Sequence, residues 1–102
     1  MTEALARLWT KFLPEITQRV AVLEAAAQAL SVGLLSAEQR DAAHAAAHKL
    51  AGTLGTFGLH QGTDLARQAE ALLAEEISRV DAVHLEGYVR ELRTLLDSRQ
   101  AL

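Results

Sequence analysis

Apolar residues recur at intervals of three and four along almost the whole chain, a spacing that places side chains on one face of an α-helix. One such series runs from Ile16 through Val20 and Leu23 to Leu30. Only 1 proline and 6 glycines occur in 102 residues, so few positions interrupt a helix. The pattern predicts an all-α fold rather than a β-sandwich or barrel.

Caps and breakers divide this pattern into one short helix and four longer ones. Thr2 is a candidate N-cap for the short helix, and Pro14 is expected to end or kink it. Ser36 followed by Gln39 has the form of a capping box, which predicts the start of another helix. The four longer helices are expected from Pro14 to residue 30, over 36–54, over 59–73 and over about 83–96. Between them we expect a connection over 31–35, a turn over 55–58 and candidate caps within 78–81.

Short connections favour antiparallel neighbours. We therefore expect an up-down antiparallel four-helix bundle with a short additional N-terminal helix, forming a single domain over residues 1–102. Aromatic residues make up only 4% of the chain, so its core must be built mainly from Leu, Ala and Val.

Composition excludes several classes of function. A formal charge of −3 argues against a nucleic-acid binder, and the absence of Cys excludes disulfides and thiolate metal sites. No apolar run approaches the roughly 20 residues that span a bilayer, and the charged N-terminal segment does not resemble a secretory leader. We therefore expect a cytoplasmic protein. No Walker-type phosphate loop is present, so the sequence does not predict a kinase that uses ATP itself.

The most informative segment lies on the helix predicted over 36–54. Leu50 and Leu54 define its buried side, and His48 lies about 160° around the helix axis from Leu50, so the imidazole should face solvent. The neighbours of His48 on this outer face are His44, Ala45, Gly52 and Gly55.

This outer face is unusual because its residues are small. A glycine inside a helix costs on the order of 1 kcal/mol relative to alanine. Gly52, one turn after His48, therefore gives up stability while clearing space around the ring. An alternative is that Gly52 and Gly55 only begin to unwind the end of the helix.

Residues 48–58 resemble a motif of a known protein family. His48-Lys49-Leu50-Ala51-Gly52, followed by Leu54, Gly55, Phe57 and Gly58, resembles the phosphoacceptor signature of histidine phosphotransfer domains, an Ala-His-x-Leu-x-Gly core with a glycine at the following turn. The resemblance covers residues 46–73 and implies a four-helix bundle that carries phosphate without kinase activity of its own.

The resemblance also implies roles for individual residues. His48 would accept the phosphoryl group, Glu70 would accept a hydrogen bond from its other ring nitrogen, and Gly52 would leave room for a partner. The implied partners are receiver domains of a hybrid histidine kinase and of a response regulator, which bring their own aspartate and Mg²⁺. The domain itself would need no cofactor or metal, and we expect a monomer.

The chain departs from the family pattern at one position. Many members carry Lys three residues after the histidine, where this chain has Ala51. Lys49 and Arg67 are the candidate cations for the phosphate environment instead. The docking surface would then include His44, Ala45, Lys49, Ala51, Gly52, Gly55 and Arg67.

Two other interpretations stay open. His44 and His48 are four residues apart, a spacing that allows two imidazoles to share one Zn²⁺ with a third ligand. That third ligand would come from Asp41, His60, Glu70 or His84. A helical adaptor or dimerisation bundle would also satisfy the periodicity, and Glu70 would then be a solvated helix charge.

Overall fold

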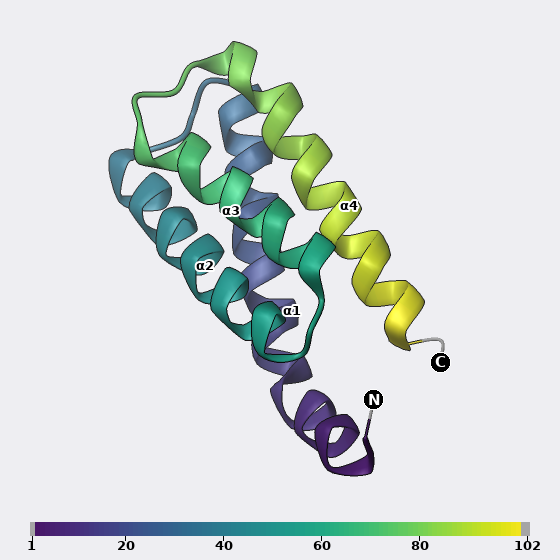
Figure 1. The fold of residues 1–102 in the computed structure, drawn as a ribbon. Helices are drawn as coiled ribbons and strands as arrows, with labels where there is room; N and C mark the ends of the chain where they lie inside the picture. The colour runs from purple at the N-terminus through teal and green to yellow at the C-terminus, as the bar shows by residue number, and fades with distance from the viewer. Residues whose placement is uncertain (1, 101–102) are drawn as a thin grey trace.

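The computed structural model describes residues 2–100 and consists mainly of four α-helices (Figure 1). The helices are α1 (Glu3–Ser31), α2 (Ala37–Thr56), α3 (His60–Ala74) and α4 (Ala82–Gln100), and a 3-10 turn, η1 (Arg79–Asp81), precedes α4. Successive helices run in opposite directions and pack as neighbours, and α1 also packs on α4, which closes the bundle. Over the described residues no strand occurs, so the predicted all-α bundle is confirmed.

The prediction of a separate short N-terminal helix was wrong. A single helix, α1, continues from Glu3 to Ser31 with Pro14 inside it. The proline removes one backbone donor, at a cost of about 3 kcal/mol. Packing on both sides of this position offsets that cost: Trp9 is buried and its ring lies edge-on to Phe57, with centroids 5.1 Å apart, while Ile16 is fully buried.

The predicted helix starts are capped by side chains. The Thr2 hydroxyl accepts a hydrogen bond from the Leu5 amide, and the Ser36 hydroxyl accepts one from the Gln39 amide at 3.0 Å. Each bond satisfies one of the amides that has no partner within the helix. The starts of α1 and α2 therefore follow directly from local sequence.

A tight turn reverses the chain between α2 and α3. The Leu59 amide donates to the Leu54 carbonyl and the Gly58 amide donates to the Gly55 carbonyl, both at 3.0 Å. Gly58 has a φ of 71°, the left-handed conformation that this C-terminal motif requires and that glycine adopts without steric cost. The turn sets α3 antiparallel to α2.

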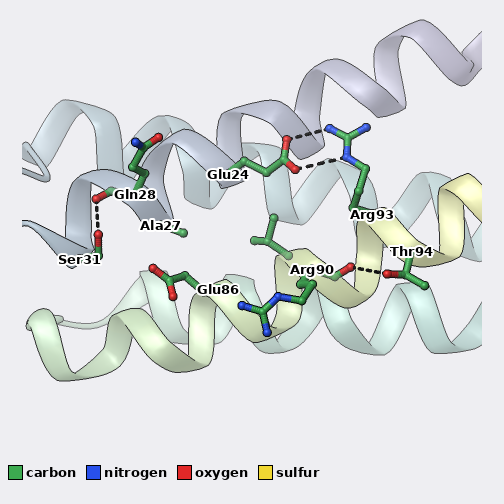
Figure 2. Close-up of a pocket in the computed structure, with 9 residues that line it drawn as sticks. Glu24, Ala27, Gln28, Ser31, Glu86, Arg90, Arg93 and Thr94 are labelled. Atoms are coloured by element: carbon green, nitrogen blue, oxygen red, sulfur yellow. Dashed lines mark hydrogen bonds and ion pairs between the residues drawn. The ribbon is translucent and has the colours of Figure 1, made fainter.

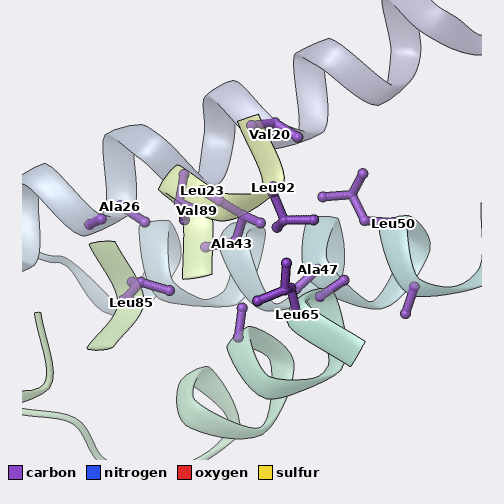
Figure 3. Close-up of a cluster of buried hydrophobic side chains, with 14 of the residues drawn as sticks. Val20, Leu23, Ala26, Ala43, Ala47, Leu50, Leu65, Leu85, Val89 and Leu92 are labelled. Carbon is purple, nitrogen blue, oxygen red and sulfur yellow. The ribbon is translucent and has the colours of Figure 1, made fainter. Parts of the chain in front are cut away.

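The core is built from leucines at the centre and alanines between α2 and α3 (Figure 3). The largest fully buried side chains are Ile16, Val20, Leu23, Leu50, Leu54, Leu73, Leu85, Leu92 and Leu96. Ala47 of α2 and Ala66 and Ala69 of α3 are also fully buried. Because the distance between packed helices depends on the side chains at their contact, these alanines let α2 and α3 approach closely. Within the described part of the chain, no helix is long and apolar enough to span a membrane.

Candidate functional site

His48 lies on the outer face of α2, in the second half of the helix. Its side chain is 73% exposed, whereas Leu50, on the opposite side of the helix, is completely buried. The helix therefore presents the imidazole outward, as its angular position relative to Leu50 predicts.

Glu70 reaches His48 from α3. Its Oε2 lies 2.7 Å from Nδ1 of His48, and its side chain is only 24% exposed. In a neutral imidazole, a hydrogen bond from Nδ1 to a carboxylate requires the proton on Nδ1 and leaves the lone pair on Nε2. The contact joins the imidazole to α3 and leaves Nε2 outside this hydrogen bond.

The surface around His48 is cleared of side chains. A Cβ atom placed on Gly52 would have no neighbour within 4 Å, and Ala45, Gly52 and Gly55 are all exposed. Gly52 lies inside α2, which continues to Thr56, so it does not mark an unwound helix end, whereas Gly55 belongs to the last turn of the helix. The clearing is a feature of an intact helical surface.

Ala51 does not belong to this exposed surface. It is only 6% exposed, and its carbonyl oxygen accepts a hydrogen bond from the Thr63 hydroxyl of α3 at 3.4 Å. Its predicted place in the docking surface was wrong because α3 covers that flank of α2. Thr63 carried no signal in the sequence, since its role depends on how α3 aligns with α2.

The other predicted positions lie around His48 with differing exposure. His44 is half-buried one turn before His48, while Lys49 and Arg67 are exposed. Neither of these two cations makes a hydrogen bond or ion pair with another residue in the described range 2–100. The structure therefore leaves two free cations near the imidazole, one on α2 and one on α3.

The zinc interpretation lacks a third ligand. Among residues 2–100, no group of three His, Cys, Asp or Glu side chains is arranged to hold a metal ion. His60 and His84 are exposed, and Glu70 is bound to Nδ1 of His48. The pair His44 and His48 alone does not make the closed site of a structural zinc.

A groove lies between α1 and α4, away from His48 (Figure 2). Arg93 donates to both carboxylate oxygens of Glu24 there, at 2.7 and 3.2 Å. The hydrogen bond to Glu24 raises the pKa of Arg93, so the guanidinium stays charged, and the contact joins α1 to α4. No histidine lines this groove, so it is separate from the surface around His48.

Comparisons with known proteins identify the family of this chain. The family model of the Hpt domain matches residues 7–101. Protein RcaC of Microchaete diplosiphon is 39% identical over 62 residues, which cover 61% of this chain and 10% of that protein. The chain thus corresponds to about a tenth of the length of that relative. No solved structure matches it. Since the family model covers nearly the whole chain, the chain belongs to the Hpt (histidine phosphotransfer) family, whose domains transfer phosphoryl groups in phosphorelays.

Proposed function

We propose that this domain carries a phosphoryl group on Nε2 of His48 and relays it between the aspartates of receiver domains. The observation that carries the proposal is the exposed imidazole whose Nδ1 is held by Glu70 at 2.7 Å. This arrangement fixes the tautomer and leaves one nitrogen accessible, which is what a phosphoryl acceptor needs.

The transfer itself requires little covalent help from the domain. The lone pair of Nε2 attacks the phosphorus of an aspartyl phosphate, the N–P bond forms, and the P–O bond to the aspartate breaks to release its carboxylate. The imidazole ring gains positive charge, which the Glu70 carboxylate stabilises through Nδ1–H. The reverse step passes the group to a second receiver, and in this proposal each receiver supplies the Mg²⁺.

The surface around His48 suits a transient partner. Ala45, Gly52 and Gly55 are exposed and small, so a receiver can bring its aspartate close to Nε2 without moving side chains. We propose receivers of a hybrid histidine kinase and of a response regulator as the partners of a monomeric domain, through a modest interface of the kind typical for signalling encounters.

The direct test is the chemistry of the adduct. Incubation of the domain with a phosphorylated receiver, or with phosphoramidate as a small donor, is expected to add one phosphoryl group. The adduct should be labile in acid and stable in base, and tandem mass spectrometry should locate it at His48. An unmodified protein, or a phosphoryl group at another residue, would contradict the proposal.

Replacing Glu70 with alanine should slow phosphorylation by phosphoramidate about tenfold, which corresponds to the loss of one partly exposed hydrogen bond between charged groups. Glu70→Gln keeps an acceptor for Nδ1–H but not the charge, so its phosphorylation rate should lie between those of the native domain and Glu70→Ala. Initial rates of adduct formation measure this effect. Glu91→Ala, at an exposed position of α4, serves as the matched control and should react at the native rate. A native rate in Glu70→Ala would show that the hydrogen bond has no chemical role.

A further inference from the structure

We infer that the Arg67 guanidinium binds the phosphoryl group on His48, an assignment that rests on the proposed phosphocarrier function. Arg67 is the only Lys or Arg residue of α3. Three observations support it: the alignment of α3 against α2, the flank of His48 that α3 covers, and the absence of another partner for this side chain.

Two contacts fix how α3 is aligned with α2. The Thr63 hydroxyl binds the Ala51 carbonyl at 3.4 Å, and two helical turns later Glu70 binds His48 at 2.7 Å. Arg67 lies between these contacts, one turn before Glu70 and about 4.5 Å from it along the helix axis. Residues at this spacing share a helix face, so Arg67 belongs to the same side of α3 as Glu70.

A step along α3 from Glu70 back to Arg67 leads toward the exposed surface of α2 around Gly52. Because α2 and α3 are antiparallel, moving back one turn along α3 moves forward along α2, from His48 toward Gly52. Gly52 has no side chain, and no atom lies within 4 Å of where its Cβ would be. The space beside Gly52 is therefore open to a long side chain.

Lys49 occupies the opposite flank of α2. It lies about 100° around the helix axis from His48, on the side away from Glu70. The next residues on that flank face α1, since Arg19 of α1 donates to the Thr53 hydroxyl at 3.5 Å. Lys49 is thus the cation nearest in sequence to His48, but Arg67 is the one placed on the side of the ring that Glu70 holds.

Other arginines that contact α2 or lie on it are already engaged. Arg19 is paired with Glu15 at 2.6 Å, and Arg40 donates to the Glu75 carbonyl at 3.4 Å. Arg67 is exposed and has no hydrogen bond or ion pair with any residue that the structure describes. Its planar guanidinium can donate two parallel hydrogen bonds to phosphoryl oxygens, which an ammonium group cannot match.

The test uses phosphoramidate as the donor, so that receiver docking plays no part. Arg67→Ala is expected to lower the rate of His48 phosphorylation about fivefold to tenfold, as for one lost charge-assisted hydrogen bond. Arg67→Lys should recover part of that rate because it restores the charge without the planar fork. Arg90→Ala, at an exposed arginine of α4, is the matched control and should react at the native rate, while Lys49→Ala tests the competing cation on the other flank of α2.

Phosphorus NMR of the phosphorylated domain gives a second readout that a purely structural role would not change. A guanidinium bound to the phosphoryl group favours its dianion, so the second pKa of that group should rise in Arg67→Ala and stay native in Arg90→Ala. Native rates and a native titration in Arg67→Ala would overturn the assignment, as would a loss confined to Lys49→Ala. If the native domain forms no His48 adduct, the proposed function itself fails, and a normal adduct in the native domain separates these two results.

Discussion

Replacing His48 with glutamine is expected to abolish phosphorylation completely while leaving the fold intact. The glutamine amide is not a nucleophile at neutral pH, so it cannot replace Nε2. The side chain is 73% exposed, so its replacement should change the free energy of unfolding by no more than about 0.5 kcal/mol. Intact mass after incubation with phosphoramidate or a phosphorylated receiver measures the first effect, and urea unfolding measures the second.

His44→Gln is the natural control for this experiment. His44 is one turn before His48 on the same helix, and it should be dispensable for adduct formation with phosphoramidate, a donor that needs no docking surface. The two variants together separate a specific acceptor from general reactivity of surface imidazoles. An adduct that persists in His48→Gln would falsify the phosphocarrier assignment.

Replacing Gly52 with glutamine should have two opposite effects. The domain should become more stable by about 1 kcal/mol, because glycine in a helix interior is less favourable than a good helix former by roughly that amount. No strain opposes this gain, since a Cβ at Gly52 meets nothing within 4 Å. Transfer from a phosphorylated receiver should fall about a hundredfold, because a displacement of about 1 Å between the reacting groups has an effect of that size. Phosphorylation by phosphoramidate should change little, since a small donor does not need the cleared surface.

Gly87 of α4 provides a matched control. A Cβ there also has no neighbour within 4 Å, and the residue lies inside a helix remote from His48 in the sequence. Gly87→Gln should therefore gain stability in urea unfolding without any loss of receiver transfer. If Gly52→Gln accepted phosphate from the receiver at the native rate, the small residues around His48 would have no role in docking.

Much of this fold could be predicted from the spacing of apolar residues, but the length of the N-terminal helix could not. Pro14 carries a local signal for a helix end, and nothing nearby in the sequence opposes it. The opposing force is the packing of Trp9 against Phe57, which lies beyond the end of α2. A contact between residues so far apart in the chain has no signature in the local pattern, so a local rule was overridden by tertiary packing.

For the candidate site, too, local helix geometry could be predicted from the sequence, whereas packing between helices could not. Helical geometry alone places His48 opposite Leu50, and the resemblance to the family directs attention to Glu70. Ala51 was misplaced because its exposure depends on how closely α3 approaches, which is set by buried alanines such as Ala66 on the other helix. The angular position of a residue on one helix can be calculated from sequence, whereas the neighbour that covers it follows only from the packed structure.

The turn at Gly58 has a consequence for how the site assembles during folding. Because the chain reverses there, the two members of the pair, His48 and Glu70, are separated by only 22 residues. Closing a loop of that length costs little conformational entropy, and contacts of short sequence separation form early and fast. The imidazole and its carboxylate can therefore meet as soon as α2 and α3 dock, before the long-range packing of α1 on α4 is complete. The acceptor geometry is a property of one helical hairpin, and the remaining helices supply the stability that keeps it in place.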